Sequence, residues 1–262
     1  MSGFGSNWSG GKQLWWHLGT TVGDKMNVYI FVEKSGMYRM NMGITTAKDY
    51  GMFDLTLNGS KIASVDGYST SVAYKTVDFG FVDLKAGYNK LQFTITGKNA
   101  SATAYLVGLD CFKATKVDES DITLYEGEDE MLANATVSAG SLRAQTMTGF
   151  GSVWSEGSQL FWTVGAADNT LSTSITVSKT GNYSLAGGFT IAKDYGIIEL
   201  YVNGVKVGTF DGYNTSVAHK ISDFGTVTLS AGANTVEIKL IGKNTSATNY
   251  YVGIDYLRIV EK

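Results

Sequence analysis

Phe53-Asp54-Leu55-Thr56-Leu57-Asn58-Gly59 alternates apolar and polar side chains and then ends in Asn-Gly. A period of two predicts a β-strand with one buried face, and Asn-Gly favours the two-residue turn of a tight hairpin. Residues 198–204 repeat this pattern, and residues 91–95 and 236–240 alternate in the same way. We therefore expect sheets that pack on a core through one face only.

Longer motifs occur twice, which indicates a tandem repeat. Ala47-Lys48-Asp49-Tyr50-Gly51 returns as Ala192-Lys193-Asp194-Tyr195-Gly196. Asp-Gly-Tyr, Asp-Phe-Gly, Gly-Lys-Asn and Val-Gly-(Leu/Ile)-Asp also occur in both halves, in the same order. A repeat of this length exceeds the unit of a solenoid, so we expect two copies of one domain.

The predicted copies span residues 1–117 and 118–262, joined at the charged segment 116–121. Copy two includes a stretch, residues 121–148, that has no counterpart in copy one after Met1. Copy one is therefore expected to leave a sheet edge exposed. About eight short strands per copy with Gly-rich turns predict an all-β protein of two tandem β-sandwiches, most simply jelly rolls.

Composition excludes several kinds of partner. The chain has 21 basic and 24 acidic side chains, whereas a nucleic-acid surface needs clustered Lys and Arg. No apolar run approaches the roughly 18–20 residues of a membrane span, and Cys111 alone cannot form an internal disulfide. The two histidines, His17 and His219, have no His counterpart in the other copy, which disfavours a catalytic triad or a His-based metal site.

Strand counting places three loops at one end of each sandwich. If a strand over residues 38–45 runs away from one end, loop 46–51 lies at the far end and the Asn58-Gly59 turn at the near end. Loops 66–72 and 97–104 then return to the far end. Copy two, in the same register, should bring the equivalent loops together.

Some motifs resemble a known family. Tyr125-Glu126-Gly127-Glu128-Asp129 resembles the opening strand of bacterial jelly-roll carbohydrate-binding modules of families 6 and 35. Gly253-Ile254-Asp255-Tyr256-Leu257 resembles their closing strand, and the Lys-Asp-Tyr-Gly run and the Asp-Gly-Tyr and Gly-Lys-Asn loops resemble accessory domains of glycoside hydrolases. The resemblance covers copy two and most of copy one. It implies non-catalytic binding of a polysaccharide or oligosaccharide by a secreted or cell-surface bacterial protein with further domains.

The three gathered loops contain the candidate ligand-binding residues. A tyrosine ring can stack on the apolar face of a sugar, while Asp, Asn and Lys bond its hydroxyls. Alternatively, the tyrosines cap the core and the aspartates fix turns. Trp8 and Trp154, in Gly/Ser-rich stretches, either expose a ring to the ligand or fold back as a lid on the core. The loop candidates are Lys48, Asp49, Tyr50, Asp66, Tyr68, Lys98 and Asn99 in copy one, and Lys193, Asp194, Tyr195, Asp211, Tyr213, Lys243 and Asn244 in copy two.

The resemblance also implies a structural Ca²⁺ in copy two, held by Glu126, Glu128 and Asp255. Glu126 and Glu128 are expected on one strand face, where their oxygens suit a divalent cation. A solvated strand edge is the alternative. Copy one has Asp110 but no Glu-x-Glu, so the resemblance places the cation in copy two only.

Two other functions stay open at this stage. One is a structural or protein-interaction spacer, which a flat, polar loop end would favour. The other is a glycoside hydrolase, which would need a cleft with two carboxylates about 5–10 Å apart. Exposed aromatic side chains gathered at the loop end favour carbohydrate binding.

Overall fold

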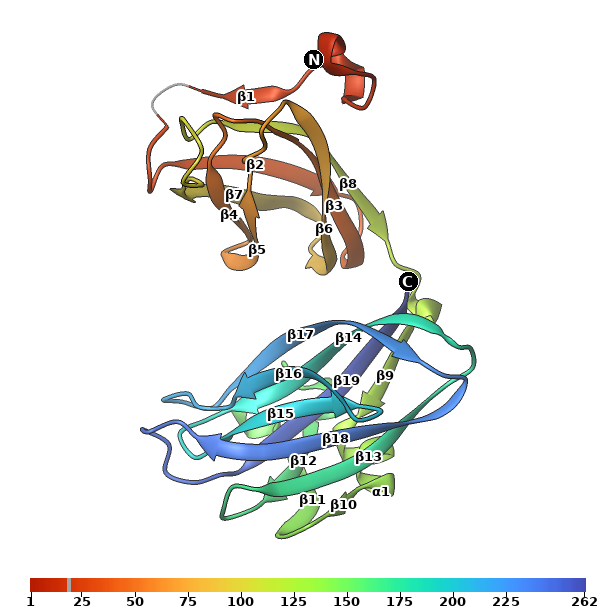
Figure 1. Cartoon of the computed structure of the whole chain (residues 1–262). Coiled ribbons are helices and arrows are strands. Elements are labelled where there is room, and N and C mark those ends of the chain that lie inside the picture. Colours follow the sequence, from red (N-terminus) through yellow and green to blue (C-terminus); the bar gives the residue numbers. More distant parts are fainter. Residues whose placement is uncertain (18–19) are drawn as a thin grey trace. The chain divides into compact units, whose positions relative to one another are not determined.

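The structure is a computed structural model that describes residues 1–17 and 20–262. The chain divides into two compact units, residues 1–117 (unit 1) and 118–262 (unit 2). Strands dominate both units, and four antiparallel sheets form two β-sandwiches (Figure 1). The predicted all-β class and sandwich architecture are confirmed. None of the helices in the described part of the chain is long and apolar enough to cross a membrane.

The described residues of unit 1 form eight strands in two sheets. One sheet has the order β1-β8-β3-β6 and the other the order β2-β7-β4-β5. Two short 3-10 turns, Ser2–Phe4 and Ser9–Gly11, precede the first strand. The strands are β1 (Leu14–Trp16), β2 (Lys25–Val32), β3 (Gly36–Thr46), β4 (Met52–Leu57), β5 (Ser60–Asp66), β6 (Ala73–Leu84), β7 (Gly87–Gly97) and β8 (Val107–Lys116).

Unit 2 repeats these sheets and adds strands from its N-terminal stretch. Its sheets have the orders β10-β13-β18-β15-β16 and β11-β12-β19-β14-β17, with β9 also paired to β19. The strands are β9 (Ile122–Glu126), β10 (Thr136–Val137), β11 (Ser141–Thr146), β12 (Ser158–Thr163), β13 (Asn169–Val177), β14 (Gly181–Ile191), β15 (Gly196–Val202), β16 (Val205–Asp211), β17 (Ala218–Leu229), β18 (Gly232–Lys243) and β19 (Val252–Glu261). Short helical turns are Glu119–Asp121, Gly127–Met131, α1 (Leu132–Asn134), Thr148–Phe150 and Ser155–Gly157.

The Asn-Gly turns form the predicted hairpins. Asn58 and Gly59 have φ angles of 49° and 97°, and Asn203 and Gly204 have 49° and 78°. Two successive residues with positive φ characterise the turn whose twist matches that of the flanking strands. The turns join β4 to β5 and β15 to β16. The apolar side chains of β4 and β15 are therefore fixed on the core side.

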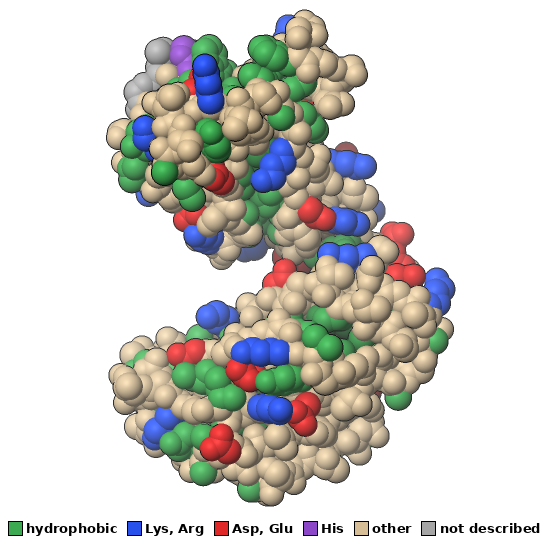
Figure 2. All heavy atoms as spheres, viewed as in Figure 1, with side chains coloured by type: hydrophobic (Ala, Val, Ile, Leu, Met, Phe, Trp, Pro, Cys, Tyr) green, Lys and Arg blue, Asp and Glu red, His purple; other side chains and the backbone are tan. Residues whose placement is uncertain are grey.

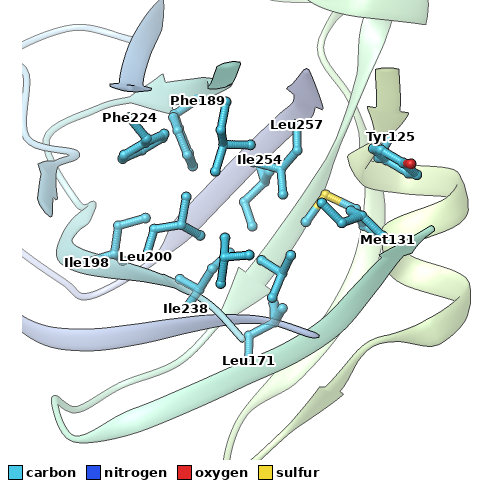
Figure 3. Packing of buried hydrophobic residues seen from close by; sticks show 14 of the residues in the cluster. Tyr125, Met131, Leu171, Phe189, Ile198, Leu200, Phe224, Ile238, Ile254 and Leu257 are labelled. Carbon is cyan, nitrogen blue, oxygen red and sulfur yellow. The ribbon is translucent and has the colours of Figure 1, made fainter. Parts of the chain in front are cut away.

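The stretch 121–148 packs within unit 2 and contributes to its core. β9 pairs with β19, β10 with β13, and β11 with β12. Tyr125 and Met131 are buried at one side of the hydrophobic cluster, close to the side chains of β19 (Figure 3). The Tyr125 hydroxyl donates a 2.5 Å hydrogen bond to the carbonyl of Thr176, which ties this stretch to β13.

One detail of this stretch corrects the sequence prediction. Glu126 ends β9, whereas Glu128 lies in a helical turn, Gly127–Met131, so the two carboxylates do not share a strand face. A Cβ on Gly127 would collide with the carbonyl oxygens of Ile254 and Asp255 in β19. Glycine therefore permits the close approach at which the chain leaves the sheet.

Unit 1 is less completely covered than unit 2. Leu14 is 51% exposed and Trp16 is half-buried, whereas their counterparts Leu160 and Trp162 are fully buried in β12, which pairs with β11. Buried apolar area stabilises a domain by about 25 cal/mol per Å², so the lower coverage of unit 1 lowers its stability.

We expect two transitions in differential scanning calorimetry of the full chain, with unit 1 unfolding at the lower temperature. Equal stability of the two units would contradict this expectation.

Candidate functional site

Three loops meet at one end of unit 1, as strand counting predicts. Isolated backbone bridges link Ala47 to Tyr68 and Tyr50 to Leu106. The Thr103 N–H also donates a 2.9 Å hydrogen bond to the Lys48 carbonyl. Loops 46–51, 66–72 and 97–106 are thus joined through their backbones. We call this region the loop end of unit 1.

Unit 2 builds the same loop end. Bridges link Ala192 to Tyr213 and Tyr195 to Tyr251, and the Thr248 N–H donates a 2.9 Å hydrogen bond to the Lys193 carbonyl. The predicted gathering of the loops is confirmed in both units. Backbone bonds hold each loop end, so its exposed side chains project from a fixed scaffold.

The Asp and Asn candidates tie two of the loops together. Asp66 accepts hydrogen bonds from the Tyr68 N–H at 2.9 Å and from Asn99 Nδ2 at 3.0 Å. In unit 2, Asp211 accepts from the Tyr213 N–H at 2.9 Å and from Asn244 Nδ2 at 3.1 Å. The first bond is the turn-fixing interaction that Asp commonly makes two residues ahead. These four side chains therefore position the loops.

Tyr50 and Tyr195 cap the core. Their side chains are only 5% and 6% exposed. The Tyr50 hydroxyl accepts a 3.0 Å hydrogen bond from Gln13 Nε2, and the Tyr195 hydroxyl a 3.2 Å bond from Gln159 Nε2. Burial raises the pKa of Tyr195 to about 12. A ring enclosed in this way offers no face to a sugar, so the stacking role expected for both residues is corrected.

Trp8 and Trp154 are lids on the core. Each is 4% exposed. Their indole Nε1 atoms donate 2.7 Å hydrogen bonds to the hydroxyls of Thr45 and Thr190. A buried indole needs such a partner, because an unsatisfied N–H in the interior is costly. Of the two predictions for these residues, the tryptophan folded back onto the core is therefore right in both units, and the exposed ring is wrong.

The residues that stay accessible at the loop ends are mainly Lys and Tyr. Lys48, Lys98 and Lys193 are exposed, and Lys243 is half-buried. Asp49, Tyr68, Asp194 and Tyr213 are also half-buried, with part of each side chain accessible. The loop ends thus present Tyr rings beside ammonium and carboxylate groups.

Each loop end also contains a second tyrosine that is not among the predicted ligand-binding residues. Lys98 Nζ lies 5.3 Å from the ring centroid of Tyr105, and Lys243 Nζ lies 4.7 Å from that of Tyr250. Such a cation–π contact holds the ring and the ammonium group side by side. Tyr105 and Tyr250 occupy equivalent positions just before the closing strand, and this repetition was the available signal.

Unit 2 also contains a buried group of carboxylates. Glu126 Oε1 accepts a 2.8 Å hydrogen bond from the Ser155 hydroxyl, and Asp255 Oδ1 a 3.0 Å bond from the Ser155 N–H. The remaining oxygens of these residues and both oxygens of Glu128 are buried without a hydrogen-bond partner. Burial, helped by repulsion from Glu126 and Asp255, raises the pKa of Glu128 to about 7. Burial also raises the pKa of Glu126.

His219 lies beside this group but forms no hydrogen bond with it. Its Nε2 is 2.8 Å from Asp255 Oδ2, yet neither atom meets the geometry of a hydrogen bond. No group of three or more His, Cys, Asp or Glu side chains already placed to hold a metal ion is found among residues 1–17 and 20–262. Each of the three carboxylates therefore has at least one buried oxygen without a hydrogen bond, but they do not form a preassembled ligand set.

Unit 1 has only part of this arrangement. Asp110 Oδ1 accepts a 2.9 Å hydrogen bond from the Ser9 N–H, as Asp255 does from Ser155. Tyr74 occupies the position of His219, and its hydroxyl lies 3.9 Å from Cys111 Sγ. The cluster of three carboxylates is thus specific to unit 2.

Comparison with known proteins gives matches among solved structures. No protein-family model and no curated protein sequence matches the chain. A Paenibacillus xanthan lyase matches 99% of this chain at 19% identity with a TM-score of 0.42, and the chain spans 24% of that lyase. A family 35 carbohydrate-binding module from Clostridium thermocellum matches 53% of this chain at 24% identity with a TM-score of 0.37, over 98% of the module.

The GH26-CBM35 β-(1,4)-mannanase of Podospora anserina matches 54% of this chain at 20% identity with a TM-score of 0.36, over 28% of the mannanase. The chain is similar to solved family 35 carbohydrate-binding modules. It spans about a quarter of the xanthan lyase and nearly the whole length of the isolated Clostridium module. At these identities the likeness concerns the fold.

Proposed function

We propose that both units are non-catalytic carbohydrate-binding modules and that each binds a sugar at its loop end. One observation carries this proposal. Each loop end has two half-buried tyrosines, Tyr68 and Tyr105 in unit 1 and Tyr213 and Tyr250 in unit 2, and in both units the second of them lies beside a lysine. A tyrosine ring offers an apolar face for a pyranose ring, and the ammonium group donates hydrogen bonds to hydroxyls.

The expected affinity is modest. Partial burial of one aromatic face contributes on the order of 1–2 kcal/mol. Two rings and a few hydrogen bonds give about −4 to −7 kcal/mol, a dissociation constant between about millimolar and tens of micromolar. Two linked sites that reach one polymer can raise the apparent affinity by roughly 10²–10⁴. Tandem duplication thus suits a polysaccharide better than a small sugar.

Two observations weigh against the alternative functions. A spacer needs no accessible rings at a loop end, yet both loop ends have them. A glycoside hydrolase commonly needs two carboxylates that flank the scissile bond. Of the two candidate aspartates at each loop end, Asp66 or Asp211 uses both oxygens to hold its loop, which leaves only Asp49 or Asp194. Lys, Arg, Asp and Glu side chains are also interspersed over the visible face of each unit, which does not favour a nucleic acid (Figure 2).

We also propose a structural Ca²⁺ in unit 2, bound by Glu126, Glu128 and Asp255. The proposal is supported by the unpartnered oxygens of all three residues, since a buried carboxylate without compensation is costly. Ca²⁺ takes six to eight oxygen ligands in flexible geometry, so these side chains would be drawn together and completed by other oxygens. The ion would offset the negative charge of the three carboxylates.

The cellular setting is part of the same proposal. By its resemblance to accessory domains of glycoside hydrolases, we place the chain in a secreted or cell-surface bacterial protein with further domains. Its role there would be to keep that protein on its polysaccharide. No nucleic acid or membrane is needed for this role.

A glycan array probed with the fluorescently labelled full chain tests the proposed function. The expected result is selective binding to one class of polysaccharide, stronger for long chains than for short oligosaccharides because of avidity. Polysaccharides offered at millimolar sugar concentration match the expected affinity. Absence of binding to every glycan class at that concentration would refute carbohydrate binding and favour the spacer.

A further inference from the structure

Unit 1 exposes a group of aromatic side chains on a sheet face away from its loop end. Tyr29 and Phe31 on β2 are 59% and 61% exposed, and Tyr88 on β7 is 76% exposed. Phe31 pairs with Tyr88 in the register of the two strands, and their ring centroids are 5.3 Å apart at an interplanar angle of 66°. Tyr29 lies two residues before Phe31, on the same face of the sheet. We call these three residues the aromatic cluster.

Unit 2 has small side chains at the same positions. Val32 pairs with Gly87 and Val177 with Gly232, so the two sheets align residue by residue. Tyr29, Phe31 and Tyr88 then correspond to Ser174, Thr176 and Ala233. Thr176 and Ala233 are exposed although the stretch 121–148 is present in unit 2. Two of the three positions are thus open even in the more completely covered unit.

The aromatic cluster is accompanied by unpaired positive charge. Lys90 stands opposite Tyr29 in the strand register, and Lys25 lies further along β2 on the same face. Neither lysine has an ion-pair partner within residues 1–17 and 20–262. Their counterparts in unit 2 are Thr170 and Thr235, so both charges belong to unit 1 alone.

The same face of unit 2 is charged differently. There, Lys239 forms an ion pair with Glu237 at 3.3 Å, and Lys206 forms one with Glu199. On this face of unit 1, Lys61 pairs with Asp54 at 2.7 Å, whereas Lys25 and Lys90 form no ion pair with any described residue. Unit 1 therefore combines large exposed rings with a local excess of positive charge, although the whole chain has a net charge of −3.

We propose that the aromatic cluster, with Lys25 and Lys90, is a second glycan-binding site that takes an acidic polysaccharide. The rings would contact the apolar faces of the sugars, and the ammonium groups would pair with carboxylates on the chain. Successive outward side chains on β2 are about 6.5 Å apart, a spacing that lets consecutive sugars meet Tyr29 and Phe31. The site extends the proposed function, because it assumes that this protein binds glycans.

The area of the aromatic cluster favours a glycan over a protein partner. Three aromatic side chains bury about 150–250 Å² each when fully covered, so the exposed part of the cluster offers roughly 400 Å². A stable protein interface buries about 800 Å² on each partner. The cluster is thus too small for a typical protein interface and large enough for a few sugar units.

Affinity electrophoresis of the full chain tests the site with two soluble polymers on one backbone. Carboxymethyl cellulose carries carboxylates, whereas hydroxyethyl cellulose is neutral. In the aromatic-cluster variant, each ring is replaced by the residue at the equivalent position of unit 2: Tyr29→Ser, Phe31→Thr and Tyr88→Ala. This variant should remain folded, and its melting curve checks that it does. We expect carboxymethyl cellulose to retard the parent more than hydroxyethyl cellulose does, and this variant to bind it at least tenfold more weakly. Lys25→Thr with Lys90→Thr should lose the preference for the charged polymer.

The loop-end variant Tyr68→Ala with Tyr213→Ala separates this site from the proposed function. It should keep the preference for carboxymethyl cellulose that the aromatic-cluster variant loses. The proposal is overturned if the parent shows no preference for the charged polymer, or if the folded aromatic-cluster variant binds it as well as the parent. It is also overturned if sedimentation shows a dimer of the parent that this variant abolishes, since the cluster would then bind a second copy.

Discussion

Glu128→Gln is expected to raise the melting temperature of unit 2 in EDTA at pH 8 and to abolish its rise on addition of Ca²⁺. The pKa of Glu128 in the folded unit is raised to about 7, mainly by burial, so its charged form opposes folding. Below the ordinary pKa of Glu, Glu128 is fully protonated and its charge does not oppose folding. As pH rises through 7, Glu128 loses this proton and the free energy of unfolding of unit 2 falls. Gln keeps the shape of the side chain without this charge.

The parent should respond to Ca²⁺ in the opposite way. A ligand present at 100 times its dissociation constant stabilises the folded state by about 2.7 kcal/mol, which corresponds to roughly 5–10 °C for a unit of this size. Calorimetry of parent and variant, in EDTA and in millimolar Ca²⁺, gives the four melting temperatures of unit 2 that the comparison needs. The transition of unit 1 is the internal control and should stay constant. A parent that melts identically in EDTA and Ca²⁺ would disprove the cation.

Trp154→Ala is expected to destabilise unit 2 by about 3–5 kcal/mol, as truncation of a buried Trp usually does. The change leaves a cavity and removes the hydrogen bond from the indole to Thr190, lowering the melting temperature of unit 2 by roughly 10 °C or more. Trp8→Ala should have the same effect on unit 1 only. Calorimetry of both variants assigns the two transitions to their units.

This prediction also distinguishes a lid on the core from a sugar platform. If Trp154 served as an exposed stacking ring, Trp154→Ala would leave the melting curve unchanged and weaken sugar binding. If Trp154 is a lid on the core, Trp154→Ala lowers the melting temperature of unit 2. At temperatures where unit 2 is still folded, the variant then binds sugar as the parent does. An unchanged melting temperature would contradict the buried position of Trp154.

Much of the fold was predictable because it depends on local patterns. The alternation in residues 53–57 fixes which side chains of β4 face the core, and Asn58-Gly59 fixes the hairpin register. Because hairpin register and strand direction follow from such turns, the loops at one end could be placed without a structure. The repeat then carried each inference to the second unit.

Burial of the loop rings could not be predicted, since their partners are distant in sequence. Gln13 contacts Tyr50, 37 residues away, and Thr45 contacts Trp8, also 37 residues away. A loop position beside glycine gives no sign of such partners. The helical turn at Glu128 was missed for a related reason, because the close approach of Gly127 to β19 is a tertiary contact.

The most direct test of carbohydrate binding at the loop ends is a titration of the double variant Tyr68→Ala, Tyr213→Ala. The titrant is the polysaccharide identified on the array, and Tyr201→Ala, a half-buried tyrosine on the sheet face of β15, is the matched control. We predict that the double variant remains folded and loses at least tenfold in affinity, that each single variant loses less, and that the control binds like the parent. A folded double variant with the affinity of the parent would contradict a binding site at the loop ends.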